Sequence, residues 1–178
     1  KEWCNFTGGA SKYVRFPTRK LFSDLPLHNQ IMKKALLEFC WDYVNERSER
    51  LKKQSGELQE SLGSETKSSA GDKHETGRAM VQLEQEKLGQ QLQEIDTTRG
   101  ILSKINIDGT YGKIRLGSLV QTSMAHYFLA ISAGAFNQNN TVVYCISTNA
   151  PIAKLLLGKE KGERFTFNGT EQEILEVD

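Results

Sequence analysis

Two series of apolar residues, each with a spacing of seven, constrain the fold of this chain more than any other feature. The series consist of Leu37, Val44, Leu51 and Leu58, and of Val81, Leu88, Ile95 and Leu102. Apolar side chains that recur every seven residues form one row of a coiled-coil seam. We therefore predict two long helices, over about residues 29–62 and 73–105.

The segment between these helices predicts how they are arranged. Residues 68–78, SSAGDKHETGR, are polar and include two glycines, which suits a connector between antiparallel helices. A helix of about 30 residues extends about 45 Å, so the connector lies far from any core. The second row of the seam is interrupted by polar residues, which predicts a thin apolar contact: Arg47, Gln54, Gln85 and Arg99.

Two acids in the connector, Asp72 and Glu75, allow two interpretations. An Asp followed three residues later by a Glu is a capping box, in which both side chains bind backbone N–H groups at a helix start. In the other interpretation, both carboxylates face outward towards a metal ion or a proton. The spacing alone leaves both interpretations open.

The pattern changes after Lys104 to short β-like runs and turns. We predict strands at 112–121, 126–132, 141–147, 164–168 and 171–177, a connector at 137–140, and a short helix at 151–158. Pro151 suits the first turn of that helix, Gly158 suits its end, and the leucines at 155–157 are expected to pack on the sheet. The fold class is therefore α+β, with three parts: an irregular extension (1–28), either native or an artefact of an upstream start, an antiparallel coiled coil (29–105) and a small domain (106–178).

Composition excludes several classes of function. The formal net charge of +1 argues against a free-standing nucleic-acid-binding domain, which is usually basic. Three widely separated cysteines cannot all pair, which favours a reducing, cytoplasmic location. The sequence lacks a run of about 18 apolar residues and a signal-peptide core, so we expect no membrane partner. It also lacks HExxH, GxSxG and phosphate-loop motifs, so we expect no self-contained active site.

Two stretches resemble the Gre-type family of bacterial transcript-cleavage and elongation factors. Gly71-Asp72-x-x-Glu75 is similar to the family's GDxxE between two helices, and residues 150–163, APIAKLLLGKEKGE, are similar to its C-terminal signature. The resemblance covers about residues 32–178. The chain departs from the family after Glu75, where TGRA (76–79) replaces the usual Asn and the Glu-Tyr pair that follows.

The resemblance implies an FKBP-like C-terminal domain that binds RNA polymerase at the rim of its secondary channel, with the coiled coil inside the channel. Asp72 and Glu75 would then be catalytic acids lent to the polymerase, sharing Mg²⁺ only in that complex. The chain would need no cofactor of its own and would not be an enzyme alone. The resemblance also implies polymerase contacts at Pro151, Gly158, Lys159 and Gly162. It implies RNA contacts at Lys67, Lys73 and Arg78, close to the RNA 3′ end and to the DNA of the elongation complex.

Two alternatives remain open from the sequence. One is a Gre-like regulator that binds the polymerase without stimulating cleavage, and the other is a coiled-coil interaction protein or chaperone unrelated to transcription. The sequence does not predict an oligomeric state.

Overall fold

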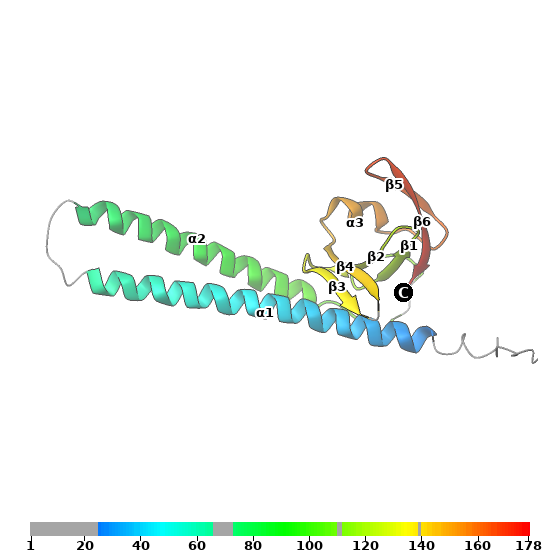
Figure 1. Ribbon diagram of the computed structural model, residues 1–178, viewed down its shortest axis with the longest axis horizontal. Helices are drawn as coiled ribbons and strands as arrows, with labels where there is room; N and C mark the ends of the chain where they lie inside the picture. The colour runs from blue at the N-terminus through cyan, green and yellow to red at the C-terminus, as the bar shows by residue number, and fades with distance from the viewer. Residues whose placement is uncertain (1–24, 66–72, 110–111, 139) are drawn as a thin grey trace, which may run out of the picture.

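The computed structural model describes residues 25–65, 73–109, 112–138 and 140–178, with helix side chains described from His28 to Ser61 and from Ala79 onward. A long helical hairpin lies beside a mixed six-stranded sheet (Figure 1). The α+β class predicted from the sequence is confirmed. Among the described helices, none is both long enough and apolar enough to cross a bilayer.

The hairpin consists of α1 (Leu25–Glu65) and α2 (Lys73–Leu102). Helix α1 begins four residues before the predicted start at residue 29, because a proline at position 26 is compatible with the first turn of a helix. Figure 1 shows the helices running side by side in opposite directions, with the last turn of α1 and the first turn of α2 at the end remote from the sheet. Near the sheet, the Arg99 guanidinium donates a hydrogen bond of 3.2 Å to Asn45 Oδ1 across the two helices.

The predicted apolar rows form the contact between the helices. Their most buried members have exposed fractions between 1% and 8%: Val44, Leu51, Leu88, Ile95 and Leu102. Leu37 and Leu58 are only partly buried. Towards the start of α1, Met32, Leu36 and Cys40 are the buried residues instead, because this part of the helix also packs on the sheet.

The sheet has the strand order β3-β4-β2-β1-β6-β5. Its strands are β1 (Leu119–Thr122), β2 (His126–Ala130), β3 (Gly134–Gln138), β4 (Thr141–Ser147), β5 (Arg164–Phe167) and β6 (Thr170–Val177). Strands β2 and β4 are parallel, and the other neighbouring pairs are antiparallel. A short helix, α3 (Pro151–Leu156), connects β4 to β5.

The sheet separates two apolar cores, because successive side chains of a strand point to opposite faces. Phe128 belongs to the core shared with the hairpin, whereas its neighbour Leu129 belongs to the core beneath α3. Figure 1 shows α1 and α3 on opposite sides of the sheet. The hairpin is therefore attached to the sheet through a continuous apolar core.

Two parts of the strand prediction are wrong. Strand β3 includes residues 137 and 138, which the sequence analysis assigned to a connector. Of the predicted strand at 112–121, only residues 119–121 belong to β1, because Gly117 adopts a φ of +88° and interrupts the extended backbone before it. A Cβ at Gly117 would lie 3.0 Å from Ile105 Cγ2, so a glycine is required there for space as well as for conformation.

Candidate functional site

The predicted acidic site falls at the start of α2, which is at the end of the hairpin remote from the sheet. Lys73, the first residue of α2, is at this end (Figure 1). Asp72 and Lys67 lie outside the described residues. Glu75 and Arg78 are on the helical backbone of α2, but their side chains, like that of Lys73, are outside the described part. The roles assigned to these five residues therefore stay predictions.

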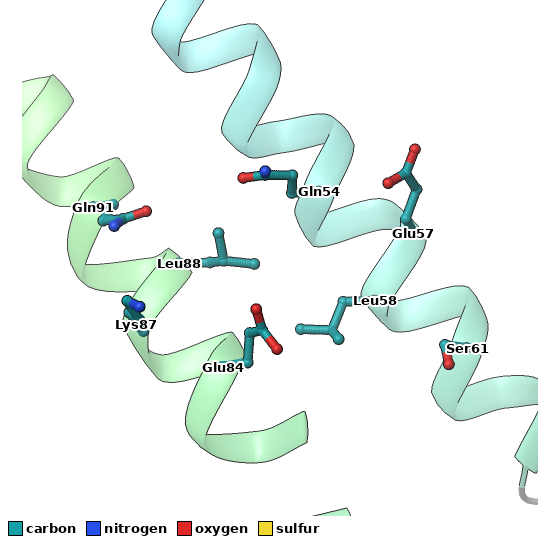
Figure 2. Close-up of a pocket in the computed structure, with 8 residues that line it drawn as sticks. All are labelled: Gln54, Glu57, Leu58, Ser61, Glu84, Lys87, Leu88 and Gln91. Carbon is teal, nitrogen blue, oxygen red and sulfur yellow. The ribbon is translucent and has the colours of Figure 1, made fainter. Parts of the chain in front are cut away.

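The two helices are held together by few apolar contacts in the half of the hairpin nearer to this end. Figure 2 shows Leu58 of α1 and Leu88 of α2 pointing towards each other across an open groove. The other residues that line the groove are polar: Gln54, Glu57, Ser61, Glu84, Lys87 and Gln91. This arrangement agrees with the thin seam expected from the sequence.

Beyond this groove, α2 exposes apolar side chains near its start. Met80 and Leu83 are 69% and 68% exposed. Among the side chains that the structure describes, His, Cys, Asp and Glu residues form no group of three or more that could hold a metal ion.

The second predicted site is the turn after α3, and its backbone is fixed by hydrogen bonds. Gly158 and Gly162 have φ values of +80° and +87°, which favour glycine. The Gly158 N–H donates to the Ile114 carbonyl at 2.8 Å, and the Gly162 N–H donates to the Ile174 carbonyl at 2.7 Å. Both glycines therefore attach the turn to the domain, while their expected contact with a polymerase stays a prediction.

The side chain of Lys159 is engaged within the same turn. Its Nζ donates to Glu163 Oε1 at 3.0 Å, and Glu163 Oε2 accepts the Glu160 N–H at 2.6 Å. The Glu160 N–H and the Lys159 ammonium both lower the pKa of Glu163, the backbone donor having the larger effect. Lys113 adds an exposed ion pair with Glu160 at 3.5 Å. The charges of this turn are therefore already arranged in the free protein.

Helix α3 presents part of its surface to solvent beside the turn. Pro151 is exposed at its first position, and Leu155 and Leu157 are 39% and 38% exposed. The expectation that all three leucines pack on the sheet is thus correct for Leu156 alone, which is fully buried. A helix presents only one face to a sheet, so three consecutive residues are not all buried against it.

Sequence reasoning missed two contacts that join α1 to the sheet. The Lys33 Nζ lies 3.5 Å from Asp178 Oδ1, and the lysine side chain is only 2% exposed. The thiols of Cys40 and Cys145 meet in the core between α1 and β4. No local pattern predicts either contact, because the partners are separated by more than 100 residues of chain.

Comparison with known proteins gives a structural likeness but no match to a protein family. No protein-family model matches the sequence, and no curated protein matches it significantly. The chain is similar to the crystal structure of GreA factor homolog 1 (Gfh1) of Thermus thermophilus, with 20% identity, a TM-score of 0.30, and coverage of 80% of this chain and 94% of that one. This superposition is too loose to carry an argument, so the function must be argued from the residues of the chain itself.

Proposed function

We propose that this chain is a Gre-type transcription factor that binds bacterial RNA polymerase and inserts its helical hairpin into the secondary channel. The observation that carries the proposal is the relation between two motifs and the fold. The GDxxE motif runs into the start of α2, at the end of the hairpin remote from the sheet. The second motif forms α3 and the turn after it, on the globular part of the protein.

The length of the hairpin that projects from the sheet follows from its helices. The residues that line the groove shared with the sheet include Arg47 on α1 and Thr98 on α2. Beyond them, the described helices continue over residues 48–65 and 73–97. At 1.5 Å per residue these segments extend about 27 and 37 Å, less than the 45 Å expected from whole helices. The proposal also includes the two structural parts that the Gre-type resemblance implies: the hairpin is a coiled coil, and the sheet with α3 is an FKBP-like domain.

The proposed mechanism supplies missing ligands to the active site of another enzyme. Asp72 and Glu75 provide carboxylate oxygens, the ligand type that Mg²⁺ prefers, to the ion that the polymerase uses when it cuts backtracked RNA. The chain stimulates this cleavage and does not cut RNA alone. Lys67, Lys73 and Arg78 are placed by the sequence beside these acids, where cations would contact RNA phosphates near the 3′ end.

The turn after α3 is the proposed docking site on the outside of the polymerase. Gly158 and Gly162 hold its backbone in a conformation that other residues rarely adopt. Pro151 and Lys159 present an apolar ring and a partly exposed ammonium on the same part of the domain. A surface that is already ordered loses less conformational entropy on binding than a flexible one.

A transcript-cleavage assay on stalled elongation complexes tests the proposal. We expect Asp72→Asn with Glu75→Gln to abolish stimulated cleavage while binding to core polymerase is retained. The matched control is Asp42→Asn with Glu46→Gln, which makes the same change in charge at two exposed positions of α1 nearer the sheet. The control should stimulate cleavage like the unchanged protein.

The outcomes separate the alternatives. If the unchanged protein binds the polymerase but never stimulates cleavage, the cleavage mechanism is wrong and a non-catalytic regulator is favoured. If the folded protein does not bind the polymerase at all, the Gre-type assignment is wrong and an interaction or chaperone role becomes the better hypothesis.

A further inference from the structure

Two cysteines that are far apart in the sequence lie close together where the hairpin joins the sheet. Cys40 on α1 has an exposed fraction of 0%, and Cys145 on β4 has an exposed fraction of 2%. Both belong to the core that the hairpin shares with the sheet, and both are free thiols. The 104 residues of chain between them include all of the distal hairpin.

Aromatic packing on one side of Cys40 places this part of α1 over β3 and β4. The ring of Phe39, the residue before Cys40, lies 5.3 Å from the ring of Phe136 on β3. Phe136 pairs with Val143 on β4, which points to the same face of the sheet as Cys145 two residues later.

Contacts on the other side of Cys40 agree with this placement. Tyr43, almost one helical turn further along α1, lines a groove together with Ile131 and Ser147. Ser147 lies two residues after Cys145 on β4. Phe39 and Tyr43 therefore place Cys40 beside β3 and the end of β4, the strand that carries Cys145.

The surroundings give the two thiols different properties. The Cys145 thiol and the Ile131 N–H donate hydrogen bonds to the Cys40 sulfur, which lowers the pKa of Cys40 despite its burial. The same hydrogen bond, together with burial, raises the pKa of Cys145. Because the thiolate is the reactive form of cysteine, Cys40 is the nucleophile of the pair.

We propose that Cys40 and Cys145 are a redox modification site at which a peroxide forms a disulfide between α1 and β4. The Cys40 thiolate attacks one oxygen of hydrogen peroxide, the O–O bond breaks, hydroxide leaves, and Cys40 becomes a sulfenic acid. The Cys145 sulfur then attacks the Cys40 sulfur, the S–O bond breaks, and the S–S bond forms. With the protons included, two thiols and one peroxide give one disulfide and two water molecules.

The disulfide would attach the base of the hairpin covalently to the sheet. The rate of its formation depends on how often the apolar contact between α1 and the sheet opens, because both sulfurs are buried in the closed structure. The site therefore makes the connection between the two parts of the protein sensitive to oxidant. This inference does not depend on binding to RNA polymerase.

The test uses the full chain with Cys4→Ser, so that Cys40 and Cys145 are its two remaining cysteines. The folded protein is treated with hydrogen peroxide, digested without reductant and examined by mass spectrometry. We expect a peptide pair joined through Cys40 and Cys145, an intact mass lower by two hydrogens, and a higher Tm that dithiothreitol reverses. Cys40→Ala and Cys145→Ala in the same background are the matched controls, and neither should form the link or gain Tm.

Two results would overturn the proposal. One is that the folded protein keeps both thiols reduced at a peroxide dose that oxidises them fully in denaturant. The other is that peroxide gives sulfinic or sulfonic acids, or disulfides between chains, without the internal link. Circular dichroism of each variant before oxidation checks that the alanine substitutions leave the fold intact.

Discussion

The Asp178→Asn substitution tests the buried ion pair that fastens α1 to the end of β6. It leaves the Lys33 ammonium, 2% exposed, beside a neutral amide in place of a carboxylate 3.5 Å away. The backbone hydrogen bonds of residue 178 with Leu119, at 2.8 and 2.9 Å, are not altered by the change. The substitution therefore removes a charge from a contact whose backbone frame stays in place.

The expected cost follows from the geometry. Removing one partner of a buried ion pair costs about 3–5 kcal/mol, because the other charge is left without compensation. Asp178 retains 12% exposure and borders a small pocket, so we expect the lower end of that range, about 3 kcal/mol. The charge of Arg115 disfavours the Lys33 ammonium further.

A double variant separates the charge effect from lost packing. Lys33→Met keeps most of the apolar stem and removes the charge, so Lys33→Met with Asp178→Asn should lie within about 1 kcal/mol of the unchanged protein. The free energy of unfolding is measured by urea denaturation followed by circular dichroism. If the double variant is as unstable as Asp178→Asn, the reasoning from an uncompensated charge is refuted.

The same pair predicts a dependence on pH. Burial lowers the pKa of Lys33 below its ordinary value of 10.5, and Asp178 opposes this only in part. Between the lowered pKa and 10.5 the unfolded chain binds the proton that the folded chain has released, so stability rises with pH in this window. The free energy of unfolding of the unchanged protein should therefore increase relative to that of Lys33→Met as the pH approaches 10.5 from below. A falling or constant difference would contradict the assigned direction.

Two smaller predictions concern single side chains, both measured by urea denaturation. Ser48→Ala should stabilise the protein by about 1 kcal/mol, because the Ser48 hydroxyl oxygen is buried without a hydrogen-bond partner among the described residues and alanine favours the helix. A loss of stability would show that the hydroxyl is satisfied in solution. Gly117→Ala should destabilise by at least about 1 kcal/mol, because a Cβ would meet Ile105 at a φ of +88°. Its matched control, Gly56→Ala in α1, meets nothing within 4 Å and should stabilise by about 0.5–1 kcal/mol; equal effects at the two glycines would contradict the steric argument.

The elements that the sequence predicted well are those whose pattern is local. The seven-residue series placed Val44, Leu51, Leu88 and Ile95 in the contact between the helices. Strand β4 has the predicted limits, because its run of β-branched and aromatic residues is bounded by turn residues. Gly158 was also expected to end the helix that begins at Pro151, and α3 does end at Leu156, just before this glycine adopts a φ of +80°.

The elements that the sequence missed depend on partners elsewhere in the chain. Strand β3, GAFNQ, has little strand propensity of its own, and it is a strand because its backbone pairs with β4 and Phe136 packs on Phe39. The candidate site was likewise predicted only in part. The sequence supplied the acids Asp72 and Glu75, whose role stays a prediction. The pairing of Lys159 with Glu163 was not predicted, because it depends on the turn that the folded chain forms between them.

The sequence by itself determined the two helices, most strands and the order of the motifs, because periodicity and turn chemistry act between neighbouring residues. Only the tertiary structure decided that the base of the hairpin is buried on the sheet. This burial shortens the part of the hairpin that projects, and it brings Cys40 close to Cys145 and Lys33 close to Asp178. The physical reason is that an apolar stripe specifies that a surface will be covered, whereas the identity of the covering surface depends on shape and distance in the folded chain.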